Sequence, residues 1–415
     1  MKSKRYFDSH RFLSSFIVLL TLLKAMSVTA QEQPLSQDSI LRMMDSIDVS
    51  LITCAPGDEI YALYGHTAIR IHDKNRHTDF AFNYGLFDFR KSLFALRFAF
   101  GKTDYELGPI RYSFFMDEYI KRHRTVWEQK INLTRLEKLS FIQEIYVNAM
   151  PENRVYRYNY FYSNCTTKAR DIIRRNIQGT LFWKKEDSTP HTYRELIHQY
   201  TLVHPWAQLL DDLCLGFKAD RPISAEAQEF LPFKLKDHFD KAYVRNADGT
   251  ERQLVSSSEM VVRGQDQPTI NCFVTPDMII VLILLLSGVL LLVELKKHNL
   301  FISFDVLIMT LYGIAGILLF VLFLSEHPTT STNLNILVLN PLYLFFIPKV
   351  LKENKQRHVT KHFLLPTVCT IVFLLAMLTR LQTFPLFTIG LALILMSRLV
   401  IRYVFVRNGE YTYIK

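Results

Sequence analysis

Cys165 is the residue in this sequence best placed to act as a nucleophile, because it stands at the predicted start of a helix. Asn164 and Cys165 open a basic amphipathic pattern over residues 165–176. Unpaired backbone N–H groups and the positive end of the helix dipole at a first turn favour thiolate over thiol. The pattern thus predicts a nucleophile near neutral pH on the inward helix face. A buried structural cysteine or one half of a disulfide would give the same pattern.

A histidine upstream is the candidate base for this thiol. Tyr64-Gly65-His66 lies in a predicted strand over residues 61–72, and Asn83 lies in the next predicted strand, residues 79–89. Alternation along both strands places His66 and Asn83 on one face. The small residues on that face are expected to leave room for the Cys165 helix. This arrangement would give a thiol, a base and an orienting amide. A structural histidine after a glycine remains the alternative.

The chain is predicted to be exported and then anchored in a membrane. Basic residues precede an apolar run over residues 12–23, and Val28-Thr29-Ala30 fits a signal-peptide cleavage site, which predicts a signal peptide over residues 1–30. An exported domain is expected over residues 31–270, a transmembrane domain over residues 277–405 and a cytoplasmic tail over residues 406–415. Five apolar runs are each long enough to cross a bilayer: residues 278–295, 301–324, 334–350, 363–379 and 384–404.

The loop charges agree with five crossings that end in the cytoplasm. The exported loop over residues 325–333 contains no Lys or Arg. Basic residues fall instead on the loops that this topology places in the cytoplasm: Lys296, Lys297, Lys349, Lys352, Lys355, Arg357, Lys361, Arg402 and Arg407.

The overall charge does not indicate a nucleic-acid partner. The chain has 49 basic and 39 acidic residues, but much of the excess lies in the signal peptide and the cytoplasmic loops, and we find no nucleic-acid motif. Arg170, Arg174 and Arg175 suit either an anionic membrane surface or a solvated helix face. No Cys-x-x-Cys or His-Glu-x-x-His spacing and no phosphate-binding glycine loop occurs, so no metal and no cofactor is expected.

The exported part is predicted to be a mixed α+β domain with a helical annex. Strands are expected at residues 51–54, 61–72, 79–89 and 126–133, and helices at residues 134–150, 165–176 and 193–200. Residues 31–48 are expected to form a polar helix or linker, and residues 247–268 a juxtamembrane segment. Disulfides among Cys54, Cys214, Cys272 and Cys165 stay open, while Cys369 falls within a span.

The order of these motifs resembles a known superfamily. Gly65-His66 followed by Asn164-Cys165 is similar to the circularly permuted papain-like thiol acyltransferases and amidases. The sequence more specifically resembles the Lnb N-terminal periplasmic domain family. The resemblance extends through Arg170-Asp171, Pro205-Trp206, Leu215-Gly216, Asp220, Phe230-Leu231-Pro232 and Glu326-His327-Pro328, and rests most on Tyr64-Gly65-His66-Thr67-Ala68-Ile69-Arg70, Phe82-Asn83-Tyr84-Gly85 and Tyr162-Ser163-Asn164-Cys165-Thr166-Thr167.

That resemblance implies a lipoprotein N-acyltransferase in the inner membrane, multi-pass, with its catalytic domain on the periplasmic side. The acyl donor would be a membrane phospholipid and the acceptor the α-amine of a diacylated lipoprotein. Cys165 would be the nucleophile, His66 the base and Asn83 the orienting residue. Backbone N–H groups near Cys165 and Thr166 are expected to bind the oxyanion. The residues expected to contact substrates are Tyr64, Tyr160, Tyr162, Asn164, Thr166, His327, Asn333 and Asn335.

Two other classes of function remain open at this stage. A papain-like thiol enzyme in this compartment would also suit cell-wall peptide, with the helices serving as an anchor. A non-catalytic envelope sensor or assembly protein is the third class. Hydrogen bonds that cap a broken third span at Pro341 are an equal alternative for His327, Asn333 and Asn335. The sequence does not specify the acyl chain, the donor headgroup, the oligomeric state or the third catalytic residue.

Overall fold

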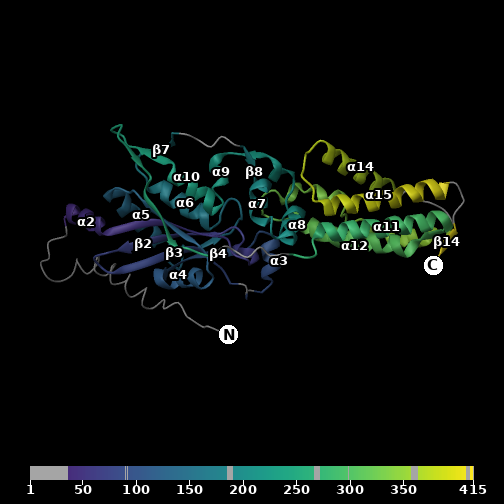
Figure 1. Cartoon of the computed structure of the whole chain (residues 1–415), viewed down its shortest axis with the longest axis horizontal. Helices are drawn as coiled ribbons and strands as arrows, with labels where there is room; N and C mark the ends of the chain where they lie inside the picture. Colours follow the sequence, from purple (N-terminus) through teal and green to yellow (C-terminus); the bar gives the residue numbers. More distant parts are fainter. Residues whose placement is uncertain are drawn as a thin grey trace.

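The computed structural model describes residues 36–88, 90, 92–184, 190–265, 272–297, 299–356, 363–407 and 412–414. A sheet-rich part is followed by an elongated helical part (Figure 1). This arrangement confirms the predicted α+β class. The predicted signal peptide, residues 1–30, lies outside the described residues.

A seven-stranded antiparallel sheet forms the centre of the exported part, in the order β12-β5-β1-β2-β3-β4-β6. Strand β2 (His66–Asp73) pairs with β1 (Ile47–Cys54) on one side and with β3 (Thr78–Leu86) on the other. The β1–β2 register places Cys54 opposite His66. The other four strands are β4 (Asp104–Arg111), β5 (Val126–Ile131), β6 (Val155–Arg157) and β12 (Val255–Val262).

Both ends of the exported part differ from the prediction. The juxtamembrane prediction for residues 247–268 was wrong, because β12 within it pairs with β5 as an edge strand. An edge strand keeps one side in solvent and tolerates polar residues, so its composition resembles that of a linker. At the other end, α2 (Gln37–Met43) and η1 (Met44–Ser46) are followed by β1, which begins before the predicted strand.

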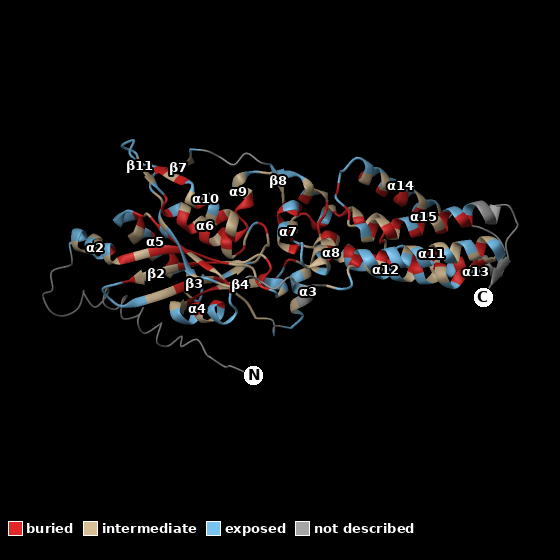
Figure 2. Cartoon of the chain, in the orientation of Figure 1, coloured by how far each residue is buried: buried red, intermediate tan, exposed pale blue. Residues whose placement is uncertain are grey.

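Helices cover both faces of this sheet. The face that carries Leu51 and Phe82 packs against α5 (Arg135–Asn148), α6 (Cys165–Asn176) and α10 (Pro232–Asp240). Figure 2 shows the buried side of α6 turned toward the strands. The opposite face, with Ala68 and Ala81, packs against α4 (Tyr112–Lys121).

The predicted position of the Cys165 helix was therefore wrong. We expected α6 to lie on the small-residue face, yet it packs on the bulky one. The small face is filled from the other side by the large side chains of α4, Phe115, Met116 and Tyr119. Strand alternation identifies two faces but does not say which helix covers which.

Shorter elements complete the exported part. A helical annex lies on the side of the sheet next to the membrane helices (Figure 1). Its longer helices are α7 (Tyr193–Thr201) and α8 (Pro205–Cys214). The remaining elements are η2 (Ile60–Ala62), α3 (Phe94–Ala99), β7 (Thr180–Trp183), β8 (His191–Thr192), η3 (Phe217–Asp220), β9 (Pro222–Ile223), α9 (Ala225–Gln228), β10 (Ala242–Arg245) and β11 (Glu251–Gln253).

Three helices of the C-terminal part are long and apolar enough to cross a membrane among the residues described. They are α11 (Pro276–Lys297), α12 (Ile302–Phe323) and α15 (Leu386–Arg407). The run over residues 363–379 forms the shorter apolar helix α14 (Leu364–Leu378). After α11 and α15, two short strands, β13 (Asn299–Phe301) and β14 (Thr412–Ile414), pair in parallel.

The prediction of one continuous helix over residues 334–350 was wrong. The segment begins with the 3-10 helix η5 (Leu334–Leu337), and the α-helix α13 (Tyr343–Gln356) starts only after Pro341. Proline lacks an amide hydrogen and disfavours helix in the residue before it. Asn340 instead accepts a hydrogen bond from the Leu342 N–H through its side chain at 3.0 Å. The alternative of a third segment broken at Pro341 is thus confirmed.

The charged residues of the helical part also depart from the sequence interpretation. Arg402 is not on a loop, because α15 continues through it and its guanidinium is buried beside Asp305 at 2.9 Å. Arg398 lies 2.6 Å from the same carboxylate and 2.8 Å from Glu294. Buried charges within membrane helices require such partners, so this cluster joins α11, α12 and α15.

Substituting Ile172 tests the packing that holds the Cys165 helix. This side chain is fully buried between α6 and the sheet. Ile172→Ala should lower the free energy of unfolding by about 2–5 kcal/mol, because a cavity replaces the lost contacts. Arg175→Ala, which removes an ion pair on the exposed side of the same helix, should cost less than about 1 kcal/mol. Thermal unfolding of the full chain in detergent measures both, and equal losses would contradict this packing.

Candidate active site

The start of α6 is fixed by the side chain of Asn164. Its Oδ1 accepts hydrogen bonds from the N–H groups of Thr166 and Thr167, both at 2.9 Å. Its Nδ2 donates to the carbonyls of Tyr160 at 2.9 Å and Phe230 at 3.0 Å. Asn164 is buried and serves as the N-cap of the helix. The structure thus gives it a structural position, contrary to our prediction that it contacts substrate.

The same cap decides which backbone donors can face a ligand. The N–H of Thr166 is occupied by Asn164, so the expectation that it binds an oxyanion was wrong. Within the described part of the chain, the N–H of Cys165 itself has no hydrogen-bond partner. One oriented donor is therefore left beside the sulfur.

Thr166 lies beneath the thiol and not in a substrate-contacting position. Its hydroxyl is buried, 3.1 Å from the hydroxyl of Thr67 on β2 and 3.8 Å from the Cys165 Sγ. Thr67 also directs its backbone N–H toward the sulfur. Neither threonine was expected to support the thiol, because Thr67 lies on the face of β2 opposite to the one on which the Cys165 helix was predicted.

Asn83 holds His66 in one tautomer. The Asn83 Oδ1 accepts the N–H of Gly85 at 2.7 Å, which identifies this atom as the amide oxygen. The His66 Nε2 lies 2.9 Å from the same oxygen and must therefore donate to it. The other ring nitrogen, Nδ1, is left for the Cys165 thiol. The predicted contact between His66 and Asn83 is confirmed.

Gly85 makes this arrangement possible. A Cβ built at position 85 would lie 2.5 Å from the His66 Cε1 and 3.1 Å from the Asn83 Oδ1. Real Cβ atoms do not approach another atom to 2.5 Å, so the imidazole occupies the space that any side chain at position 85 would take. The small residue expected to admit the helix instead admits the histidine.

Cys165 and His66 form a hydrogen-bonded, charge-stabilised pair. Burial alone would raise the pKa of the Cys165 thiol, but the charge and hydrogen bond of His66, the Thr67 N–H and the Thr166 hydroxyl lower that pKa to about 7. Burial would lower the pKa of His66, yet the Cys165 charge and the bonds to Cys165 and Asn83 raise it. Both shifts favour a thiolate beside an imidazolium.

The other thiols lack this environment. All five cysteines are free, so Cys165 is not half of a disulfide. Burial raises the pKa of Cys54 and of Cys214 to about 12 in each case. Of these three thiols, Cys165 alone has the lowered pKa of a nucleophile.

The loop that leads to Cys165 is tied to the helical part. Tyr160 donates its hydroxyl to the Pro328 carbonyl at 2.6 Å, and its ring lies 4.6 Å from that of His327. His327 in turn donates from Nε2 to the Phe98 carbonyl at 2.8 Å. Tyr160 and His327 therefore join the two parts, and their contact with a substrate stays a prediction. Tyr162, 58% exposed, remains accessible to a ligand.

Asn333 and Asn335 have the same joining role. Their Nδ2 atoms donate to backbone carbonyls of α8, those of Leu213 at 2.5 Å and Asp212 at 3.1 Å. Both asparagines are at most 1% exposed. The prediction that they line a substrate site is not supported by these positions, and the alternative of internal hydrogen bonds describes them.

Tyr64, the residue before Gly65-His66, extends its side chain toward α8. Its hydroxyl donates to Asp211 Oδ2 at 2.7 Å. The sequence indicated Tyr64 as a site residue but gave no signal for Asp211, because nothing local distinguishes it from the adjacent Asp212. The contact joins residues 147 positions apart.

The basic face of α6 is neutralised within the domain. Arg170 pairs with Asp171 at 2.7 Å, Arg174 with Glu229 at 2.8 Å and Arg175 with Glu144 at 2.6 Å. These arginines are therefore held by carboxylates of the same domain, although Arg175 stays on the exposed side of the helix.

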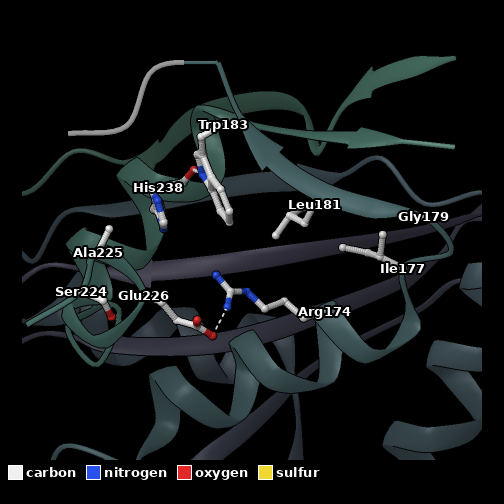
Figure 3. A pocket seen from close by; sticks show the side chains of 9 residues that line it. All are labelled: Arg174, Ile177, Gly179, Leu181, Trp183, Ser224, Ala225, Glu226 and His238. Carbon is white, nitrogen blue, oxygen red and sulfur yellow. Dashed lines mark hydrogen bonds and ion pairs between the residues drawn. The ribbon is translucent and has the colours of Figure 1, made fainter. Parts of the chain in front are cut away.

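A cavity of about 420 Å³ lies beside α6, and Cys165 is not among its lining residues. Figure 3 shows the side chains that line it. Arg174 and Glu226 meet across it, and Trp183 stacks on His238 at 4.2 Å at its edge. None of its lining residues belongs to the Cys165, His66 and Asn83 group. Among the described residues, no cluster of three His, Cys, Asp or Glu side chains is arranged to hold a metal.

Two family models match the chain. The model of the Lnb N-terminal periplasmic domain matches residues 37–199, and the model of the Lnb transmembrane domain matches residues 268–409. Together the two ranges cover nearly three quarters of the chain, in the order in which the two parts occur. No curated protein and no solved structure matches the sequence.

The pH dependence of Cys165 alkylation tests the thiolate–imidazolium pair. With a pKa of about 7, the thiolate forms as pH rises through 7, whereas an ordinary thiol needs a pH of about 8.5. In His66→Ala the stabilising charge is lost while burial remains, so the midpoint should move above 8.5. Iodoacetamide labelling read residue by residue in a mass spectrometer gives both midpoints. Coincident curves for wild type and variant would contradict the pairing.

Gly85→Ala tests the placement of His66. The added methyl should displace the imidazole from Asn83 and Cys165, which raises the thiol pKa and slows Cys165 alkylation at pH 7 by at least about tenfold. The fold should be retained, since Gly85 needs no positive φ. Gly288→Ala, where nothing lies within 4 Å of the added Cβ, is the matched control and should label at the wild-type rate. An unchanged rate in Gly85→Ala would show that the imidazole is not confined there.

Proposed function

The chain belongs to the Lnb family, and from this premise we propose that it is a lipoprotein N-acyltransferase with Cys165 as its nucleophile. Family and helices together make it a membrane protein with a periplasmic domain. The proposal adds the inner membrane as its location, a phospholipid as the acyl donor and the α-amine of a diacylated lipoprotein as the acceptor.

In the first half-reaction the Cys165 thiolate attacks an ester carbonyl of the phospholipid. The developing oxyanion meets the N–H of Cys165, and such a donor contributes about 3–4 kcal/mol where it has been measured. The C–O bond breaks, and His66 transfers its Nδ1 proton to the leaving alkoxide. Lysophospholipid departs, leaving an acyl thioester on Cys165 and a neutral His66.

In the second half-reaction the lipoprotein amine attacks the thioester carbonyl. A C–N bond forms, the C–S bond breaks, and the neutral His66 accepts a proton from the attacking nitrogen. The amide product leaves, and the thiolate–imidazolium pair is restored. Asn83 keeps Nδ1 directed at the sulfur throughout, because its oxygen accepts only the Nε2 hydrogen.

The loop that leads to Cys165 and includes Tyr160 is called the nucleophile loop here. The observation that carries this proposal is that this loop is attached to the membrane part. Tyr160, which accepts a hydrogen bond from the helix cap Asn164, also donates to Pro328 in the loop after α12. The thiol is thereby held close to the end of a membrane helix. Both proposed substrates keep their acyl chains in a bilayer, so an enzyme acting on them needs its nucleophile at that level. A cell-wall peptidase would not need it.

Trapping the acyl-enzyme tests the proposed reaction. Full-length protein incubated with phospholipid alone should gain the mass of one acyl chain on Cys165, because the first half-reaction needs no amine. Hydroxylamine should remove that mass. Cys165→Ser should lose transfer to a diacylated lipopeptide by at least about 10³-fold, while it keeps the wild-type melting temperature.

Two outcomes would overturn the assignment. Near-normal transfer by folded Cys165→Ser would exclude the thiol mechanism. Absence of any lipid-derived adduct together with cleavage of cell-wall peptide would identify a peptidase. The lipoprotein N-termini of cells with and without the protein, compared by mass spectrometry, provide the independent readout.

A further inference from the structure

In the acyl-enzyme the sulfur of Cys165 is acylated, so His66 is the one catalytic group of the proposed reaction that is free to accept a proton. An α-amine has a pKa of about 8 and enters the site largely as ammonium at neutral pH. It must lose one proton before it attacks the thioester and a second one as the amide forms. The neutral His66 of the acyl-enzyme can take only one of them. The other proton must pass either to solvent or to a second group at the site before the attack, and this inference rests on the proposed function.

Asp211 is a half-buried carboxylate that forms no direct ion pair in the part of the chain that the structure describes, although the charges of His198 and Arg194 act on it. Its partner is the Tyr64 hydroxyl at 2.7 Å. The neighbouring Asp212, in contrast, is paired with Arg194 at 2.5 Å and His198 at 2.9 Å. A carboxylate withdrawn from water without a cation is unfavourable by itself, which makes Asp211 a candidate for binding a cation that arrives with a substrate.

The position of this pair suits the acceptor amine. Tyr64 is separated from His66 by Gly65 alone and packs in one apolar cluster with Phe161 and Phe230. Phe161 belongs to the loop before Cys165, and the carbonyl of Phe230 accepts a hydrogen bond from the Asn164 cap. Asp211 is carried by α8, which also contacts the membrane helices α11 and α12. The pair thus lies between the nucleophile loop and the membrane part.

We propose that Tyr64 and Asp211 form the acceptor-amine subsite, which binds a primary ammonium group and removes its first proton. The phenol oxygen of Tyr64 accepts a hydrogen bond from the ammonium, and its own hydrogen is already directed at Asp211. As the N–H bond breaks, its proton passes to Tyr64 while the phenol proton passes to Asp211. The nitrogen is left neutral with its lone pair, and the carboxyl group later releases the proton to solvent.

The titration behaviour of both groups agrees with this role. Burial raises the pKa of Asp211 to about 6, opposed by the Tyr64 hydrogen bond and by the charges of His198 and Arg194. The carboxylate is consequently ionised above pH 6, yet is a stronger base than a solvated aspartate. Burial and the Asp211 charge raise the pKa of Tyr64, which keeps it a neutral hydroxyl.

The competing explanation is that the Tyr64–Asp211 bond merely holds the segment before β2 against α8. The variant Asp211→Asn distinguishes this explanation from the proposed subsite. Its amide oxygen still accepts a hydrogen bond from the Tyr64 hydroxyl, but the amide no longer takes up a proton. The experiment isolates full-length acyl-enzyme, adds a diacylated lipopeptide with a free amine, and follows loss of the thioester in a single turnover. Thioester formation from phospholipid is measured separately for each variant.

We expect Asp211→Asn to form the thioester within twofold of the wild-type rate and to transfer it about 100-fold more slowly at pH 7. Above the amine pKa the acceptor enters already neutral, so at pH 9 the deficit should fall below about fivefold. Tyr64→Phe should show the same selective, pH-rescued loss. Tyr200→Phe, whose ring lies 6.0 Å from that of Tyr64, is the matched control and should leave both rates within twofold.

The outcomes separate this inference from the proposed function. Transfer at the wild-type rate by Asp211→Asn would overturn the subsite, because a merely structural bond survives in that variant. An equal slowing of both half-reactions by Tyr64→Phe without rescue at pH 9 would also overturn it, because that variant loses the bond. If wild-type protein forms no thioester at all, the acyltransferase proposal itself fails, and the acceptor subsite fails with it.

Discussion

The hydrogen bonds of Asn164 are the constraint on which the site depends. This one side chain caps α6, binds the carbonyl of Phe230 and holds the loop at Tyr160. Because its oxygen occupies the N–H groups of Thr166 and Thr167, the N–H of Cys165 is left as the oriented donor beside the sulfur. A buried amide with its donors and acceptor satisfied costs little to bury and fixes the backbone more firmly than apolar packing would.

The thiolate needs a second constraint, which the sheet provides. Burial opposes ionisation of Cys165, so the thiolate exists near neutral pH only because His66, Thr67 and Thr166 meet the sulfur from β2 and from α6 itself. Asn83 and Gly85 on β3 determine where the imidazole lies. The chemistry is therefore assembled from two paired strands and one helix start. Cys54 lies across the ladder from His66, but burial raises the pKa of its thiol.

The junction between the two parts extends this rigidity to the membrane. The loop after α12 receives hydrogen bonds from Tyr160 and directs His327 to Phe98, while Asn333 and Asn335 bind the end of α8. Gly216 lies so close to this loop that a Cβ there would be 2.3 Å from the Thr332 carbonyl carbon. The helix that starts at Cys165 is thus held in a fixed position relative to the membrane helices.

The sequence alone identified features whose causes are local. Periodicity and residue type predicted the helix that starts at Cys165, the shared face of His66 and Asn83, the α+β class and the long apolar helices, since each depends on neighbours a few residues away. Tertiary structure decided which sheet face α6 covers, that β12 is a strand, that Asn164, His327, Asn333 and Asn335 join elements, and that Asp211 meets Tyr64. These features depend on contacts between residues far apart in the chain, and the sequence around a residue does not identify its distant partner.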